Sequence, residues 1–450
     1  MFYYKGKEIR RVGFLGFGKS NLGIFSYLSK RCDFEVILRA SLPIDAPSVS
    51  PKFTYFGKDM LAKIDEDILF LSPSARRDVF EIEEATKKGV IISSDAEFFF
   101  EKSKSDVYAV TGSDGKSTTS YLTSRLIKSN YKNTVCCGNI GEAMTPHLDD
   151  PCGTAYVTEL SSFQLMYMTP KNARCIITNI TENHLNWHKS FGEYITAKSH
   201  VLENSKERIF NFDCEISRNL ARSYNVFAVF SKNYPENYLR KCVKSDLYVT
   251  LRDGNITVCG EKLLKTSEIL AGGEHNVLNF MAAIAMSYGK SQKNDIEDLA
   301  KTFNGLPHRC ELVCEYKGVK YYDSSIDSSP KRCIATLKSM PNKVILILGG
   351  RSKGLDFKEM ISTLEEKTKF VVLTGEAGLE IKEFLTNCQN IRFRYTDDFY
   401  DAIEHAVAEA KSGDTVLLSP AATSFDKFKN FEERGNAFKE YVRYLKSKGY

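Results

Sequence analysis

A short loop rich in glycine and hydroxyl residues, TGSDGKSTT at 111–119, carries the residue types that bind phosphate. The apolar run VYAV precedes it and an amphipathic helical pattern follows it. At such a strand–helix junction backbone N–H groups bind phosphate oxygens, Lys116 would reach the β- and γ-phosphates, and Ser117 would hold Mg²⁺. The usual motif has glycine where this chain has Val110. A plain turn without a ligand therefore stays open at this point.

A carboxylate follows a neighbouring strand pattern. The run TAYVTEL at 154–160 places Glu159 at its end. Because Mg²⁺ takes hard oxygen ligands, a carboxylate beside the loop would suit a magnesium–nucleotide site. Taken alone, Glu159 is more often a solvated residue at a strand end than a metal ligand.

These residues depend on the elements that present them, and strand-like apolar runs alternate with helical segments along the whole chain. The pattern is typical of α/β domains with parallel sheets and crossover helices, whose ligands bind beyond the carboxyl ends of the strands. The apolar runs lie at 11–18, 34–40, 67–72, 89–94, 106–112, 154–160, 174–180, 343–350, 369–375 and 414–420. Polar stretches at 101–106 and 304–309 predict three domains, 1–104, 105–305 and 306–450.

The first strand–turn, GFGKSN at 16–21, is close to a dinucleotide-binding fingerprint but ends in Asn21. The second strand ends at Arg39, where an NAD site would place an acidic residue. A nucleotide diphosphate bound by backbone N–H groups and by cationic or hydroxyl side chains fits this turn better than NAD. A tight turn without a ligand is the alternative.

Composition excludes several other classes of protein. The net charge of +5 over 450 residues gives no basic stripe of the kind that nucleic-acid binders carry. The longest aliphatic run, 344–348, is far shorter than the roughly 20 residues of a membrane helix, and the N-terminus lacks an apolar signal core. The twelve cysteines include no CxxC pair, which favours reduced thiols over a zinc site. We therefore expect a cytoplasmic protein with no membrane or nucleic-acid partner.

A series of motifs, in order along the chain, resembles the Mur ligases, the ATP-dependent amide-forming ligases of peptidoglycan synthesis. The motifs are TGSDGKST, GNIGEA (138–143), ELSSFQL (159–165), ITNITENHLNWH (177–188), TAK (196–198), GEHNVLN (273–279), GLPHR (305–309), LGGRSKGLDF (348–357) and SPAATSFDKFKNFEERG (419–435). The short loop TG-x-x-GK-[ST] is the form found in that family, which accounts for Val110. The last string resembles the branch that adds D-glutamate to UDP-N-acetylmuramoyl-L-alanine.

The resemblance implies an α/β protein of three domains. These are a Rossmann-like N-terminal domain for the UDP-linked substrate, a central P-loop mononucleotide-binding ATPase domain, and a Rossmann-like C-terminal domain for the amino acid. It implies ATP and two Mg²⁺ ions as cofactors, with Lys198 carbamylated so that it offers an anionic oxygen. UDP-N-acetylmuramoyl-L-alanine and D-glutamate would be the substrates, and we expect a monomer.

The resemblance also implies roles for individual residues. Catalytic roles fall to Lys116, Asn139, His184 and Lys198, and metal binding to Ser117, Glu159, His184 and Lys198. ATP binding is expected at Gly112, Ser113, Asp114, Gly115, Lys116, Ser117, Thr118, His275, Asn276, Arg309 and Asp323. The UDP-linked substrate would meet Lys19, Ser20, Arg39 and Ser74, and the amino acid would meet Ser328, Lys353, Ser424 and Phe431.

Three departures from the family pattern bear on these roles. Asn183 and the pair Asn186-Trp187 remove charge near the second metal, and the segment YYDSSIDSSP at 321–330 lacks the family's lysine. Asp327 adds a negative charge there. We expect it to point to solvent or to cap the helix that begins near Pro330, because an Asp just before a helix that starts with Pro is a typical N-terminal cap. If Asp327 instead faces the pocket, it would repel D-glutamate and favour a neutral or cationic amino acid.

Three alternatives stay open from the sequence. One is another Mur-type or folylpolyglutamate-type ligase with a different amino acid. A second is a nucleotide-binding regulator without catalysis, which the presence of Lys116, Glu159 and Lys198 disfavours. The third is an NAD-dependent oxidoreductase, which Arg39 disfavours.

Overall fold

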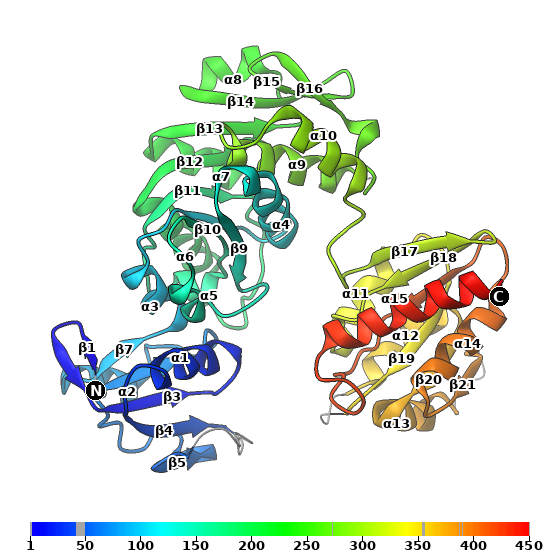
Figure 1. The fold of residues 1–450 in the computed structure, drawn as a ribbon, viewed down its shortest axis with the longest axis horizontal. Helices are drawn as coiled ribbons and strands as arrows, with labels where there is room; N and C mark the ends of the chain where they lie inside the picture. The colour runs from blue at the N-terminus through cyan, green and yellow to red at the C-terminus, as the bar shows by residue number, and fades with distance from the viewer. Residues whose placement is uncertain are drawn as a thin grey trace. The chain divides into compact units, whose positions relative to one another are not determined.

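Three mainly parallel β-sheets with surrounding helices make up the protein in a computed structural model (Figure 1). The structure describes residues 2–41, 50–271, 273–352, 356–386, 388 and 390–449. Residue contacts divide the chain into two compact units, Met1–Thr302 and Phe303–Tyr450. The first unit contains two of the large sheets and the second contains one. The predicted domain boundaries at 104/105 and 305/306 stay predictions.

The first sheet is a five-stranded parallel sheet in the order β5-β4-β3-β6-β7. Its strands are almost continuous apolar runs, as expected when helices cover both faces of a parallel sheet. A short hairpin, β1 and β2, precedes it. The elements are β1 (Phe2–Tyr4), β2 (Lys7–Ile9), β3 (Arg11–Leu15), α1 (Lys19–Ser29), β4 (Glu35–Ala40), β5 (Phe53–Phe56), β6 (Ile68–Leu71), α2 (Phe80–Lys87), β7 (Ile91–Ser93) and α3 (Asp95–Lys102).

The second sheet has nine strands in the order β16-β15-β14-β13-β12-β11-β8-β10-β9. Strands β8 to β14 are parallel to one another, and β15 and β16 extend the β14 edge, each antiparallel to the strand before it. The strands are β8 (Val107–Thr111), β9 (Asn133–Gly138), β10 (Thr154–Glu159), β11 (Asn172–Ile177), β12 (Ser205–Asn211), β13 (Val226–Ser231), β14 (Ser245–Arg252), β15 (Asn255–Val258) and β16 (Glu261–Lys265).

Two helices on this sheet, α5 and α6, begin at side-chain caps. Ser190 caps α6 by accepting a hydrogen bond from the N–H of Glu193, and Ser161 forms a capping box with Gln164 at α5. Helix α4 packs against α9, as Figure 1 shows. The helices are α4 (Lys116–Leu126), α5 (Ser162–Leu165), α6 (Phe191–Glu203), α7 (Glu215–Leu220), α8 (Glu236–Cys242), α9 (Glu274–Ser287) and α10 (Lys293–Thr302).

The second unit is built on a six-stranded sheet in the order β17-β18-β22-β19-β20-β21, parallel except for β17. Apolar clusters fill both faces of this sheet beneath its helices. The elements are β17 (Glu311–Tyr316), β18 (Val319–Asp323), α11 (Pro330–Ser339), β19 (Val344–Gly349), α12 (Ile361–Lys367), β20 (Thr368–Thr374), α13 (Gly375–Leu385), β21 (Phe393–Tyr395), α14 (Phe399–Glu409), β22 (Thr415–Leu418) and α15 (Phe431–Lys448).

The fold is therefore mixed α/β with parallel sheets, as the alternation of strand and helix patterns predicts. Among the described residues, no helix is long and apolar enough to cross a membrane.

Candidate active site

The loop between β8 and α4 has the form of a phosphate-binding loop. Gly115 stands immediately before α4, which begins at Lys116. The first turn of a helix leaves N–H groups without intrahelical partners, and these point toward an anion placed at the helix N-terminus. Ser117 and Thr118 lie in this first turn, with Ser117 buried and Thr118 partly buried.

The segment that follows β11 holds the loop in place through hydrogen bonds and close packing. The side-chain oxygen of Asn179 accepts hydrogen bonds from the N–H groups of Ser113 at 3.2 Å and Asp114 at 2.8 Å. Gly112 has φ +147°, and a Cβ there would lie 1.9 Å from Oγ1 of Thr178. The ring hydroxyl of Tyr194 hydrogen-bonds Oγ of Ser113 at 2.9 Å. The loop shape therefore depends on the close approach of β11 as well as on its own sequence.

Lys116 folds back over the loop. Its Nζ donates a hydrogen bond to the carbonyl oxygen of Ser113 at 2.7 Å. The ammonium group is held at the loop, where it would meet bound phosphates.

Glu159 and Asn139 are brought beside the loop by strand register. Strand β10 lies between β8 and β9, so that Glu159 pairs with Val110 on one side and Gly138 on the other. Asn139 follows β9, and its Nδ2 donates to Oε1 of Glu159 at 2.7 Å. Glu159 is only 2% exposed, and its Oε2 has no hydrogen-bond partner among the described residues.

A buried carboxylate oxygen without a partner is costly unless a cation or another donor compensates it. Oε2 of Glu159 is such an atom at the edge of a phosphate loop. The residues present therefore fit a divalent cation of the hard-oxygen class, with the hydroxyl of Ser117 at the start of α4 as a second ligand.

Lys198 reaches the same place from α6. Its side chain is buried, Nζ donates to the carbonyl oxygen of Gly112 at 2.6 Å, and it lies 4.7 Å from the centre of the Tyr194 ring. Burial, reinforced by the positive charge of Lys116, lowers the pKa of Lys198 well below its ordinary value, although Glu159 and Asp114 act in the opposite direction. The motif TAK singled out this lysine, but its burial could not be predicted from the sequence.

His184 lies on an exposed turn after β11, with φ +56°. Its ring centre is 4.9 Å from that of Phe163 and 6.4 Å from that of Tyr194. Partial desolvation lowers the pKa of His184, and the positive charges of Lys198 and Lys116 lower it further. Asn183 accepts a hydrogen bond from the N–H of His184 at 2.8 Å, so this departure from the family pattern helps to form the turn.

The start of α9 is linked to the phosphate loop through a residue that sequence analysis did not single out. Nδ2 of Asn279 donates to Oδ1 of Asn276 at 3.3 Å, and Oδ1 of Asn279 would lie 2.4 Å from a Cβ at Gly115. Asn276 also donates to the carbonyl oxygen of Ala271 at 2.9 Å. His275 is exposed one position earlier. Asn279 is the last residue of the motif GEHNVLN, so its place in that motif could have marked it as a functional residue.

In the first sheet, the predicted contacts of the UDP moiety follow strands β3 and β6. Lys19 and Ser20 open α1, and Ser74 lies on the exposed loop after β6. The carbonyl oxygen of Ser74 accepts a hydrogen bond from Nε1 of Trp187 at 2.8 Å. This contact connects the loop to the turn that carries His184.

Arg39 requires a correction. Its side chain has 0% exposure and forms a two-point ion pair with the equally buried Glu66, at 2.8 and 2.9 Å. It also donates to the carbonyl oxygens of Met60, Ala62 and Lys63. Because its side chain is fully buried against Glu66 and these carbonyl oxygens, Arg39 anchors the 60–66 segment and is not available to the UDP moiety.

In the second unit, most of the described candidate residues lie before β17, before α11, after β22 and at the start of α15. Arg309 is exposed before β17, Ser328 is partly buried before α11, and Ser424 is buried after β22. Phe431 is partly buried at the first position of α15, with its ring centre 6.1 Å from that of His308. Lys353 lies outside the described residues.

Two acidic residues of this unit depart from expectation. Asp323 is fully buried, with Oδ2 hydrogen-bonded to Nδ1 of His308 at 2.7 Å and Oδ1 accepting from the N–H of Ser325 at 2.8 Å. With no exposure and both oxygens engaged, it is not available for the ATP contact that the resemblance implies. Asp327 neither points to solvent nor caps α11, because it is 4% exposed and accepts a hydrogen bond from Oγ of Ser419 at 2.8 Å.

Arg434 is a buried residue of this unit that sequence analysis overlooked, although it lies in the string NFEERG. Its guanidinium donates to Oγ of Ser325 at 3.0 Å, to the carbonyl oxygen of Ser325 at 2.9 Å and to that of Ala422 at 3.1 Å. Burial lowers the pKa of Arg434 to about 10, while the negative charges of Asp426, Asp323 and Asp327 oppose the shift. Arg434 thus places a cation among three acidic residues of this unit, with Asp426 the strongest influence on its pKa and Asp327 the weakest of the three.

Comparison with known proteins agrees with these motifs. The family model described as the Mur ligase middle domain matches residues 110–287, and the one described as the Mur ligase, glutamate ligase domain matches residues 308–422. A UDP-N-acetylmuramoylalanine–D-glutamate ligase of Ruminiclostridium cellulolyticum is 36% identical, with 99% of this chain and 98% of that protein covered. A ligase of the same name from Clostridium perfringens is 35% identical, with 98% and 97% covered.

A solved structure shares the fold. The crystal structure of UDP-N-acetylmuramate-alanine ligase from Thermotoga maritima matches with a TM-score of 0.54, covering 98% of this chain and 100% of that chain. The sequence identity is 18%, so this likeness concerns the fold alone.

Proposed function

Because the chain belongs to the Mur ligase family, we propose that it is an ATP-dependent ligase that joins D-glutamate to UDP-N-acetylmuramoyl-L-alanine in the assembly of peptidoglycan precursors. The observation that carries the proposal is the cluster of Lys116, Glu159 and Lys198 around the phosphate loop. It combines cations for phosphates with an unpartnered carboxylate oxygen for a metal.

The reaction has to make an amide from a carboxylate, which is a poor electrophile. Transfer of the γ-phosphoryl group of ATP to the carboxylate of UDP-N-acetylmuramoyl-L-alanine gives an acyl phosphate and ADP. The amine of D-glutamate then attacks the acyl carbon, loses a proton, and inorganic phosphate leaves as the amide forms. Such a site works by positioning the reactants and stabilising charge.

The residues of the first unit divide this work. The start of α4 and Lys116 would hold the phosphates, and Asn139 would orient the carboxylate of Glu159 and meet the donor carboxylate. His275 and Asn276 would approach the adenine. Lys19, Ser20 and Ser74 would hold the UDP moiety.

Magnesium would be held by Ser117 and Glu159, with a second ion at His184 and Lys198. Bound Mg²⁺ would neutralise charge on the transferred phosphoryl group. The pKa of His184 is lowered by partial desolvation and nearby cations, which favours the neutral imidazole that metal binding needs. The pKa of Lys198 is lowered mainly by burial, which favours the neutral amine that adds CO₂ to become a carbamate.

The second unit would supply the amino-acid site and one phosphate contact. Ser328, Lys353, Ser424 and Phe431 are the proposed amino-acid residues, and Arg309 the proposed cation for the ATP phosphates. The burial of Asp327 and its hydrogen bond from Ser419 support the choice of an anionic amino acid, because this carboxylate is engaged inside the unit. We infer three domains, one for each large sheet, in a cytoplasmic monomer.

The identity of the nucleotide product tests this function. With UDP-N-acetylmuramoyl-L-alanine, D-glutamate and Mg²⁺ present, ATP is expected to yield ADP and phosphate in equal amounts, measured by chromatography of the nucleotides. Release of AMP and pyrophosphate would mean that the carboxylate is activated by adenylation, and would overturn the proposal.

A further inference from the structure

The turn that carries Arg309 has an uncommon backbone. His308 has φ +60° and Cys310 has φ +49°, so a residue with a left-handed backbone lies on each side of Arg309. Side chains make this conformation unfavourable, and it persists where surrounding contacts enforce it. The N–H of Arg309 bonds the carbonyl oxygen of Leu306 at 3.1 Å and closes the turn.

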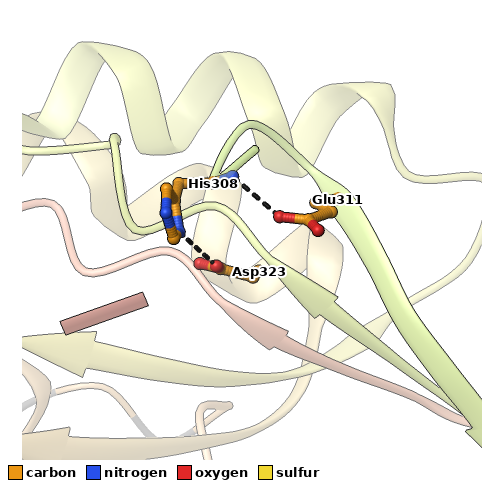
Figure 2. A group of neighbouring side chains, drawn as sticks. All are labelled: His308, Glu311 and Asp323. Carbon is orange, nitrogen blue, oxygen red and sulfur yellow. Dashed lines mark hydrogen bonds and ion pairs between the residues drawn. The ribbon is translucent and has the colours of Figure 1, made fainter. Parts of the chain in front are cut away.

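Buried polar contacts hold His308 in this conformation (Figure 2). Nδ1 of His308 lies 2.7 Å from Oδ2 of Asp323, and the backbone N–H of His308 donates to Oε2 of Glu311 at 2.9 Å. Because a carboxylate only accepts, Nδ1 is the donor in the first bond. His308 is 6% exposed and Asp323 0% exposed, so this bond is shielded from water.

Further contacts fix the backbone around the turn. The carbonyl oxygen of His308 accepts from the N–H of Ile326 at 3.1 Å, and the N–H of Cys310 donates to Oγ of Ser324 at 3.1 Å. The turn is thus tied to the residues that follow β18, and Arg309 is exposed at its tip.

Helix α15 leaves just enough space for the His308–Asp323 pair. A Cβ at Gly435 would lie 2.1 Å from Nδ1 of His308 and 2.7 Å from Oδ2 of Asp323. Any side chain at this position would push the pair apart. Gly435 therefore offers a steric means of disturbing the pair without removing any polar group.

We propose that His308 is a positioning residue, which together with Asp323 holds Arg309 in the orientation that meets the ATP phosphates. This inference rests on the role given to Arg309 in the proposed function. It assigns His308 no contact with a substrate and no proton transfer.

The same side chains could be read as a metal site, since ligand atoms of His308, Glu311 and Asp323 lie within 4.8 Å of one another. The atoms that could bind a metal already have other partners. Oε2 of Glu311 also pairs with Nζ of Lys439 at 3.0 Å, and both oxygens of Asp323 accept hydrogen bonds. An ammonium group beside the cluster would repel a cation, so positioning is the better assignment.

Single variants test the bond. His308→Ala removes the donor, whereas His308→Asn keeps a nitrogen donor at the δ position and tolerates positive φ. We expect His308→Ala to lower kcat/KM for ATP at least about tenfold, since small misplacements of a positioned group are costly, and His308→Asn to restore it to within about threefold. Equal losses in both variants would mean that the imidazole itself is needed, and would overturn the proposal.

Gly435→Ala provides a second route, with Asn436→Ala, an exposed neighbour on α15, as its control. Alanine favours helix over glycine, so a loss in Gly435→Ala would come from the displaced pair. The expected result is a fall in kcat/KM for ATP like that of His308→Ala, with Asn436→Ala unchanged. Wild-type kinetics in a folded Gly435→Ala variant would contradict the proposal.

A double-mutant cycle decides whether His308 acts through Arg309. In an Arg309→Ala background, His308→Ala is expected to change kcat/KM for ATP less than about twofold, because the group that it positions is gone. Additive losses would overturn the proposal. ATP affinity measured by calorimetry, without amino acid, repeats the cycle independently of the ligase reaction. A normal ATP affinity and kcat/KM in Arg309→Ala alone would instead remove the proposed role of Arg309.

Discussion

At the scale of single residues, the chemistry depends on charges that burial has altered. Lys198 is the clearest case, because its amine is buried against the loop carbonyl of Gly112 and close to Lys116. A lowered pKa favours the neutral amine, which can add CO₂, and the proposed carbamate would then offer an oxygen to a metal.

Replacing Lys198 by alanine is therefore expected to abolish nearly all ligase activity. Added formate or acetate should restore part of it, since a small carboxylate can occupy the space of the carbamate. Phosphate release measured with and without these anions checks the expectation, and a fully active Lys198→Ala enzyme would exclude the carbamate.

Lys116 and Glu159 carry opposite charges in the same cluster. Lys116→Ala removes the cation at the loop, and Glu159→Ala removes the buried oxygen that suits a metal. Each is expected to lower kcat at least about 10²-fold, the scale of one lost electrostatic contact at a reacting group. Steady-state kinetics are the measurement, and turnover within a few-fold of wild type would refute the assigned role.

Residue types along the chain indicated the phosphate loop and Glu159 because the chemistry of these positions is local. They could not indicate the internal partners of polar residues. Arg39 pairs with Glu66, 27 positions away, and Asp327 bonds Ser419 on another strand end. Such long-range pairs are set by sheet order, which no local pattern encodes.

At the scale of elements, the loop after β6 is fastened to the turn that carries His184. The guanidinium of Arg76 pairs with Glu193 at 3.0 Å and Asp78 at 2.7 Å, donates to the carbonyl oxygen of Trp187, and lies over the Trp187 ring. The apolar runs at 67–72 and 174–180 predicted the strands that precede this loop and this turn. They could not predict this junction, which depends on side chains at loop ends.

The junction makes stability depend on pH. The hydrogen bond from Arg76 is the largest cause that lowers the pKa of Glu193 to about 2. A lowered carboxyl pKa contributes stability that is present above the ordinary value of 4.5 and is lost as the pH falls toward 2. Glu193→Gln is expected to reduce the free energy of unfolding by about 1–3 kcal/mol at pH 7.

The difference in free energy of unfolding between Glu193→Gln and wild type should shrink as the pH falls from 4.5 toward 2. Wild type then loses the stabilisation that the ionised Glu193 provides. Denaturant titrations at pH 7 and pH 3 measure it, and Glu432→Gln on α15 controls for removal of an exposed carboxylate. A pH-independent difference would contradict the assigned ion pair.

At the scale of the whole molecule, one chain combines three parallel sheets that present their candidate residues at the carboxyl ends of strands. The central claim is that this arrangement serves amide formation with D-glutamate. Asp327 is the residue most opposed to an anionic amino acid, yet it is buried and accepts a hydrogen bond from Ser419.

Phosphate release from ATP, measured with UDP-N-acetylmuramoyl-L-alanine and a panel of amino acids, tests this claim most directly. Pterin-linked acceptors in place of the UDP-linked substrate test the folylpolyglutamate-type alternative in the same assay. The predicted result is release that requires the UDP-linked substrate and is strongest with D-glutamate. Release that ignores D-glutamate and follows a neutral or cationic amino acid, or a pterin-linked acceptor, would contradict the account.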